Sequence, residues 1–144
     1  MKISTKGRYA LRFMIDLAQN NSGVPVSLKD VAARQGISDK YLEQIVAGLN
    51  KAGLVRSIRG PQGGYLLTKE VKDYTVGEIL RVIEGSLAPV SCMDTDVIGC
   101  ERREHCCTLP LWKKLNDAIN DVVDHTTLES LLEWDQDGSD NYVI

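Results

Sequence analysis

Residues 27–53 read SLKDVAARQGISDKYLEQIVAGLNKAG and predict two short helices joined by a tight turn at Gly36. The first helix begins at Ser27, which has capping-box spacing with Asp30. Ser38 can cap the second helix, which Gly53 ends. Four apolar side chains form one stripe along this second helix: Leu42, Ile45, Val46 and Leu49. Two short helices around a glycine turn are typical of a helix-turn-helix.

The apolar stripe leaves a second face of this helix pointing outward. Lys40, Gln44 and Ala47 face directly away from the stripe, and Tyr41 and Glu43 lie at the edges of that face. Glutamine can bond adenine with two hydrogen bonds, and lysine and tyrosine can reach guanine or phosphate. These residues therefore predict a base-reading face, although taken alone they also fit an ordinary solvated helix face.

The residues after this helix predict a β-hairpin. Residues 54–59 and 65–68 read as two short strands, joined through Gly60-Pro61-Gln62-Gly63-Gly64. A hairpin directly after a reading helix is the wing of a winged helix, and Arg59 near its tip can enter a narrow minor groove. A nucleotide phosphate-binding loop is the alternative, but its Lys-Ser/Thr ending is missing and no helix follows.

Amphipathic helices flank the motif on both sides. Ala10, Phe13, Met14 and Leu17 repeat at helical spacing and predict a core helix over residues 6–19. A further helix is expected between Thr75, which has capping-box spacing with Glu78, and Gly85. We therefore expect a mainly α fold, with residues 1–85 forming a winged helix-turn-helix DNA-binding domain with a small β-hairpin wing.

Charge divides the chain into two unlike parts. Residues 1–69 hold eleven Lys and Arg against four Asp and Glu, whereas residues 70–144 hold six against sixteen. A basic half beside an acidic half suggests that one end meets a polyanion. The first residues lack the apolar run typical of a signal peptide, and no stretch approaches the roughly 18 to 20 apolar residues of a membrane span. We expect a cytoplasmic protein without membrane contact.

All four cysteines fall within sixteen residues: Cys92, Cys100, Cys106 and Cys107. Thiols this close in a cytoplasmic chain favour zinc or an iron-sulfur cluster over disulfides. The first three are separated by seven and five residues, and neither gap is the two-residue gap typical of zinc pairs. Residues 86–108 show no sustained period and are expected to form a cluster-binding loop. Free cysteines, a zinc site and a disulfide switch are the alternatives.

The residues after the cysteines predict a long helix. Pro110 suits its first turn, and one apolar stripe follows over about four turns: Leu111, Leu115, Ala118, Ile119 and Val122. A winged helix usually reads a two-fold DNA site as a dimer, so this stripe predicts a dimerisation helix in residues 109–144. Thr126 is expected to cap a last short helix. A polar tail that begins at Asp135 is expected after this helix.

Several short motifs follow one another in a specific order along nearly the whole chain. They are Ser4-Thr5-Lys6-Gly7-Arg8-Tyr9-Ala10, Tyr41-Leu42-Glu43-Gln44, Arg59-Gly60-Pro61, Val76-Gly77-Glu78 and the three spaced cysteines. In this order they resemble the Rrf2 family of bacterial winged-helix transcriptional regulators, and within it the branch that senses iron-sulfur status.

The resemblance implies a homodimer that binds double-stranded DNA and carries a 2Fe-2S cluster. Carried over by position, the cluster ligands would be Cys92, Cys100 and Cys106. The DNA contacts would come from the reading helix and the wing: Ser38, Lys40, Tyr41, Glu43, Gln44, Arg59, Gly60 and Pro61.

One position departs from the cluster-binding branch. There a histidine three residues after the last cysteine supplies the fourth ligand, and this chain has Leu109 at that position. The identity of the fourth ligand is therefore open. It could be a group from the other subunit or one of these residues: Cys107, His105, Glu43, Glu101 and Glu104.

Two other functions compete with cluster sensing. A cysteine-metabolism repressor of the same family, controlled by a protein partner or by thiol redox state, is the first. Iron-sulfur assembly or cysteine-biosynthesis proteins are the candidate partners. The second is a redox enzyme that uses the cysteines. It is not expected, because the chain has no Cys-X-X-Cys pair, nucleotide fingerprint or paired acid-base constellation.

Overall fold

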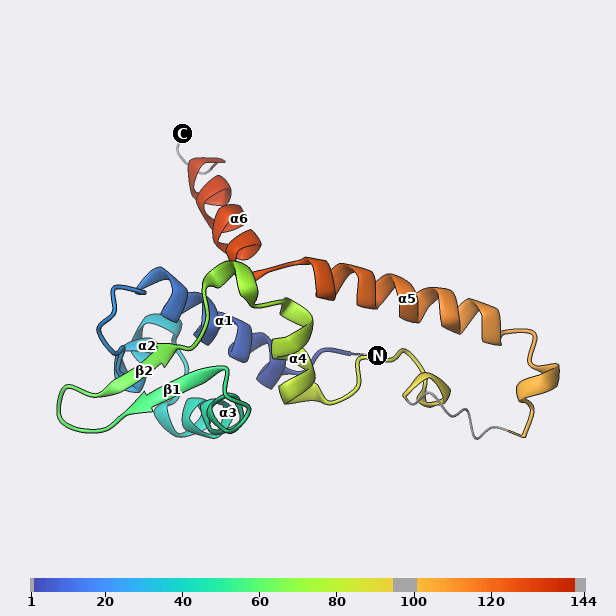
Figure 1. The fold of residues 1–144 in the computed structure, drawn as a ribbon, viewed down its shortest axis with the longest axis horizontal. Coiled ribbons are helices and arrows are strands. Elements are labelled where there is room, and N and C mark those ends of the chain that lie inside the picture. Colours follow the sequence, from blue (N-terminus) through green and yellow to red (C-terminus); the bar gives the residue numbers. More distant parts are fainter. Residues whose placement is uncertain (1, 95–100, 142–144) are drawn as a thin grey trace.

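Four helices and a hairpin form the body of the molecule (Figure 1) in the computed structural model, which describes residues 2–94 and 101–141. The helices are α1 (Thr5–Gln19), α2 (Leu28–Gln35), α3 (Asp39–Lys51) and α4 (Val76–Glu84). The strands are β1 (Val55–Ile58) and β2 (Gly64–Leu67), which pair antiparallel with Val55 opposite Leu67. The predicted helix-turn-helix and the hairpin after it are thus confirmed.

The predicted apolar stripes meet in one core. Ala10, Phe13, Met14 and Leu17 of α1 are at most 1 % exposed, and the four stripe residues of α3 pack against them. Burying each large apolar side chain contributes about 1.5–3 kcal/mol. This core holds α3 in place and leaves its opposite face to solvent.

Hydroxyl caps set the helix starts. Ser27 Oγ accepts the Asp30 N–H, and Ser38 Oγ accepts the Tyr41 N–H, both at 3.2 Å. Gly36 between these helices has a φ of 65°, in the left-handed region that glycine adopts without strain. The first helix begins at Thr5, slightly earlier than predicted, because Ser4 Oγ accepts the Gly7 N–H.

A buried tyrosine ties the base of the hairpin to the core. Tyr74 is fully buried, and its hydroxyl donates to the Leu54 carbonyl at 2.7 Å. The same oxygen accepts the N–H groups of Thr68 and Lys69 at 2.8 and 3.1 Å. Both ends of the hairpin are therefore fixed by one side chain.

Asp16 is the only charged side chain that is buried among the described residues, at 1 % exposure. It accepts two hydrogen bonds from Arg34, at 3.1 and 2.7 Å, and one from Gln35 at 2.9 Å. Asn20 adds a fourth contact. Burial alone would raise the pKa of Asp16, but the bonds from Arg34 and Gln35 and the Arg34 charge outweigh it and lower the pKa. The carboxylate thereby joins α1 to α2.

Two further helices leave the body. Helix α5 (Leu109–His125) extends away from the body as an arm. Helix α6 (Leu128–Asn141) projects from the body next to the C-terminal end of α5 (Figure 1). The expected short last helix with a tail from Asp135 was wrong, since α6 continues to Asn141. The expected cap at Thr126 was also wrong. Thr127 Oγ1 accepts the Ser130 N–H, whereas Thr126 is the C-cap residue of α5 and its hydroxyl donates to the Val122 carbonyl at 2.7 Å.

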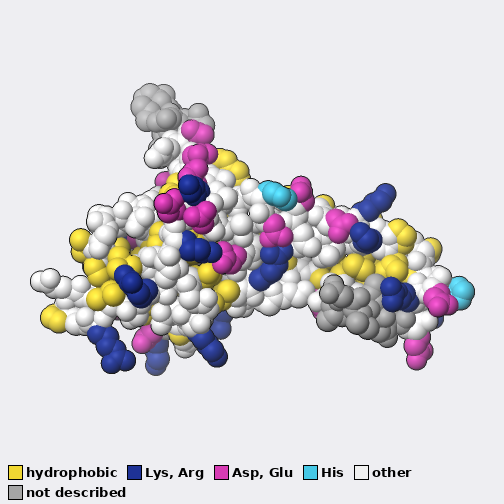
Figure 2. Space-filling view, in the orientation of Figure 1, with side chains coloured by type: hydrophobic (Ala, Val, Ile, Leu, Met, Phe, Trp, Pro, Cys, Tyr) yellow, Lys and Arg dark blue, Asp and Glu magenta, His cyan; other side chains and the backbone are white. Residues whose placement is uncertain are grey.

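The charge division has a spatial counterpart. Lys and Arg side chains project from the edge of the body near α3 and the hairpin, whereas Asp and Glu side chains run along α6 (Figure 2). Within residues 2–94 and 101–141, no helix combines the length and apolar character needed to cross a bilayer. The basic edge coincides with the predicted reading face.

Candidate nucleic-acid interface and cysteine segment

The predicted reading face of α3 is exposed. Lys40, Glu43, Gln44 and Ala47 lie in solvent, as does Ser38 at the cap. All of them stand on a helix whose other face is anchored in the core. Such a helix can enter a major groove with its side chains directed at base edges.

Tyr41 lies at the edge of this face and is only half exposed. Its ring packs edge-to-face on Tyr9 of α1, with ring centres 5.8 Å apart. The Arg12 guanidinium lies 5.3 Å from the centre of the Tyr9 ring and donates to the Gln35 side chain at 3.0 Å. Aromatic packing therefore fixes the Tyr41 ring beside the reading face.

The hairpin tip is a tight turn. Arg59, Gly60 and Pro61 are exposed there, and the Gly63 N–H donates to the Gly60 carbonyl at 2.9 Å. A Cβ on Gly63 would lie 2.1 Å from the Ile58 carbonyl oxygen, which no side chain allows. The turn thus holds Arg59 at the end of the wing, as the sequence predicts.

The cysteine segment is described in part. Cys92 lies half-buried in the short turn η2 (Ser91–Met93), which packs against α5. Cys106 is half-buried and Cys107 exposed, between the turn η3 (Arg103–His105) and the start of α5. Cys100 falls outside the described residues, which contain no group of three or more His, Cys, Asp or Glu placed to hold a metal ion.

Cys106 lines a hollow of about 400 Å³ together with Arg102, His105, Cys107 and Thr108. The Thr108 hydroxyl lies 3.3 Å from the sulfur. This contact, the Thr108 and Leu109 backbone and the Arg102 charge outweigh desolvation and lower the pKa of Cys106. A lower pKa favours the thiolate, which is the form that binds metal.

The structure narrows the choice of a fourth ligand within one chain. Helix α3, which carries Glu43, lies in the body, whereas η3 lies at the far end of the α5 arm (Figure 1). Glu43 is therefore remote from Cys106 of its own chain, whereas His105 and Cys107 share the hollow with it. Glu101, just before η3, and Glu104, within it, are both exposed.

The α5 arm carries an uncovered apolar face. Leu111, Leu115 and Val122 are 54, 42 and 63 % exposed, and none of the described residues of this helix is buried. Four side chains line a hollow of about 340 Å³ on it: Ala118, Ile119, Val122 and Val123. A solvated helix with such a face is incomplete as a single chain.

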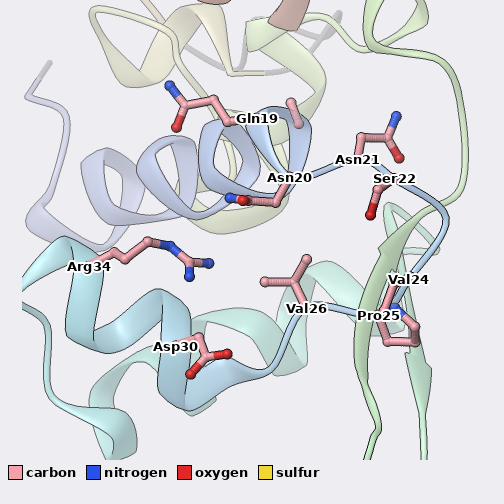
Figure 3. A pocket seen from close by; sticks show the side chains of 10 residues that line it. Gln19, Asn20, Asn21, Ser22, Val24, Pro25, Val26, Asp30 and Arg34 are labelled. Carbon is pink, nitrogen blue, oxygen red and sulfur yellow. The ribbon is translucent and has the colours of Figure 1, made fainter.

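A polar hollow of about 490 Å³, which the sequence did not indicate, lies between the end of α1 and the start of α2. Figure 3 shows Arg34 and Asp30 of α2 on one side and the amides of residues 19–21 on the other. Arg34 and Asn20 are bonded to Asp16, and Gln19 donates to Asp135. Its polar groups therefore mainly link elements of the protein to each other.

Residues 3–134 match the model of the Rrf2 family, described as iron-dependent transcriptional regulators. The chain belongs to the Rrf2 family. The transcriptional regulator CymR of Bacillus subtilis is 43 % identical over 144 residues, which cover 100 % of this chain and 99 % of CymR. IscR of Escherichia coli K12 is 41 % identical over 132 residues, which cover 92 % of this chain and 80 % of IscR.

Solved structures agree with this assignment. The structure of CymR, the global cysteine regulator of B. subtilis, superposes with a TM-score of 0.77 at 44 % identity, and the match covers 93 % of this chain and 98 % of the CymR chain. The structure of T. potens IscR superposes with a TM-score of 0.75 at 43 % identity, and the match covers 100 % of this chain and 93 % of the IscR chain. The expected winged-helix fold is confirmed, and this Rrf2 protein is a DNA-binding transcriptional regulator rather than an enzyme.

Proposed function

We propose that this Rrf2 regulator acts in the cytoplasm as a homodimer that adjusts transcription to iron-sulfur status through a 2Fe-2S cluster. The observation that carries the proposal is the set Cys92, Cys100 and Cys106, placed between the DNA-binding body and the α5 arm. Thiolates are the usual ligands of such clusters, so the donor set fits in kind. The lowered pKa of Cys106 adds to the fit.

The cluster has a defined task in this proposal. When bound, it would supply a covalent tie among three cysteines that depends on iron supply and redox state. Incomplete thiolate ligation, with Leu109 at the histidine position, suits a sensor because the cluster is more easily lost. Through this tie the cluster would hold the segment between α4 and α5 in place and would change how α3 is presented to DNA.

Iron and sulfide counts test the cluster directly. Anaerobically purified protein is expected to hold iron and sulfide in equal amounts, about two of each per chain, with visible absorption bands of a 2Fe-2S centre. Serine at Cys92, Cys100 or Cys106 should each abolish these bands, since oxygen is a poor substitute for a thiolate.

Cys107→Ser is the comparison variant, because Cys107 is a neighbouring thiol that is not one of the three proposed ligands but is a candidate for the fourth. Retained absorption in this variant would exclude Cys107 as the fourth ligand. A wild-type protein without iron or sulfide after anaerobic reconstitution would contradict the cluster proposal.

For DNA, we propose that α3 enters the major groove with Ser38, Lys40, Tyr41, Glu43 and Gln44. The wing would place Arg59 in the adjacent minor groove, with Gly60 and Pro61 at the backbone. The exposure of these residues and their place on the basic edge of the body support this assignment. Two α5 arms packed together would present two such bodies to a two-fold site.

Two substitutions separate affinity from specificity. Arg59→Ala is expected to weaken binding to a selected DNA duplex, and Gln44→Ala to relax base preference, each by about 1–3 kcal/mol. Fluorescence anisotropy on matched and mutated duplexes measures both effects. Lys72→Ala is the charge control, since Lys72 lies in η1 (Val71–Asp73) beside α6. Unchanged binding in both test variants would remove these roles from α3 and the wing.

A cysteine-metabolism repressor is the second candidate. The observation in its favour is that the match to CymR covers 99 % of that relative, whereas the match to E. coli IscR covers 80 %. Here the acidic part of the chain would dock a metabolic protein, and that partner would set DNA affinity. Co-purification of a partner with iron-free protein, together with DNA binding that ignores iron, would favour this function over cluster sensing.

A further inference from the structure

Arg81 of α4 joins the body to the α5 arm. Its guanidinium donates to both carboxylate oxygens of Asp124, at 2.5 and 3.1 Å, and to the Asn120 side chain at 2.9 Å. Asp124 and Asn120 lie one turn apart on α5. A planar guanidinium that bonds two oxygens of one carboxylate fixes both distance and orientation. Arg81 therefore sets how α4 and α5 meet.

The backbone beneath this pair is shaped to admit it. Gly77 is buried one turn before Arg81, and a Cβ there would lie 2.2 Å from Asp124 Oδ1 and 3.1 Å from the Val123 side chain. A side chain larger than that of glycine would push the Asp124 carboxylate and the Arg81 guanidinium out of these positions. The close contact and the ion pair thus belong to one arrangement of the two helices.

Arg81 also faces the cysteine segment. It lines a hollow of about 370 Å³ whose other walls include Asp124 of α5 and Leu87, Met93 and Asp94 of that segment. Met93 directly follows the proposed ligand Cys92. Asp94 brings a second carboxylate into the hollow, so a shift of the segment changes the charge that Arg81 meets.

The other side of α4 reaches the reading helix. Ile83 Cδ1 lies 3.7 Å from the position that a Cβ on Gly48 of α3 would take. Glu84, the last residue of α4, accepts both the N–H and the hydroxyl of Ser4, at 2.9 and 2.6 Å. A tilt of α4 would therefore alter its direct contacts with α3 and with the start of α1.

We propose that Arg81 is the positioning residue that couples the cysteine segment to the DNA-reading helix. Arg81 holds α4 against α5 through Asp124. It also lines the same hollow as the cysteine segment, so a change in that segment would change the surroundings of its guanidinium. The inference rests on the proposed function, because it names the route by which an ordered cysteine segment would act on α3. Coupling between two sites requires such an element with two arrangements that both sites bias.

The test compares DNA affinity in two states of each protein. One state is reconstituted anaerobically with ferrous iron and sulfide, and the other is stripped with a chelator. The DNA is one duplex selected by the wild-type protein. The wild-type affinity ratio between these states is expected at about 5-fold to 150-fold, the usual range of coupling. In Arg81→Gln the ratio should fall to within about 2-fold of one.

Lys69→Gln is the matched control. Lys69 forms an ion pair of similar exposure with Glu78, also on α4 but not in the hollow. This variant should keep the wild-type ratio. An unchanged ratio in Arg81→Gln would overturn the coupling role, whereas a wild-type ratio of one would contradict the proposed function instead.

Hydrogen exchange of the iron-free protein gives a readout that does not need the cluster. Arg81→Gln should speed exchange in α3 and in residues 86–94, and Lys69→Gln should not. Faster exchange confined to α4 and α5 would overturn the coupling role. Asp124→Asn removes the charge from the α5 side and answers the same question if Arg81→Gln fails to fold.

Discussion

A chain that carries both Leu115→Glu and Val122→Glu is expected to be monomeric and to bind a two-fold DNA site about 10²–10⁴-fold more weakly. Leu115 and Val122 lie two turns apart on the uncovered face of α5 and are 42 and 63 % exposed. In a dimer each glutamate would be buried against apolar side chains of the partner, where an unpaired charge is costly. The second half-site then no longer benefits from being tethered to the first.

Sedimentation of the free protein and anisotropy on the selected duplex measure the two effects separately. Lys113→Glu is the control, because it changes the net charge by the same amount on the polar face of α5, where Lys113 is paired with Asp117. It should leave both the mass and the affinity near wild type. If the double variant sediments as a dimer, the α5 face is not the dimer contact.

The sequence predicted the parts of the fold that rest on local spacing. The stripe of Leu42 and Ile45 and the cap at Ser38 lie within one helix, so their signal is complete in a short window. The wing followed from two short β-rich runs around Gly60-Pro61. The exposure of Gln44 and Arg59 was predictable for the same reason.

The sequence did not predict contacts between distant positions. Tyr74 donates to Leu54, twenty residues earlier, and Arg81 bonds Asp124 across forty-three residues. Nothing in the local pattern marks either side chain as a link. Gly77 was seen only as part of a motif, although a Cβ there would displace the Asp124 carboxylate from its place beside Arg81.

The last helix shows a different limit. Polarity after Trp134 suggested an irregular tail, but a polar sequence without proline can continue a helix once its first turns are anchored. Leu128 is fully buried in the core, and Gln19 donates to Asp135 at 3.0 Å, so the anchor lies in the body. For the cysteines, clustering within sixteen residues indicated a soft-metal site, and Cys100 lies outside the described residues.

Asp16→Ala is expected to destabilise the fold by about 3 kcal/mol, a large share of the 5–15 kcal/mol typical of a domain. The substitution removes the acceptor of four hydrogen bonds and leaves the Gln35 amide without its partner. The loss should stay below that of a fully buried ion pair, because the Arg34 side chain is 43 % exposed and can turn to solvent. Urea unfolding at neutral pH measures it. Asp117→Ala, at an exposed pair, should change stability by no more than about 0.5 kcal/mol.

The pH dependence distinguishes a lost charge from a lost volume. Because the folded protein lowers the pKa of Asp16, the unfolded chain takes up this proton first as pH falls. The stabilisation from the carboxylate is therefore complete above its unfolded pKa of about 3.9 and is lost as pH falls through the folded value. The difference between wild type and Asp16→Ala should shrink over this acid range and stay constant between pH 6 and 8. A difference that does not change with pH would show that Asp16 acts only by filling space. Since the same carboxylate holds α2 against α1, the variant should also lose DNA affinity under conditions where it is still folded.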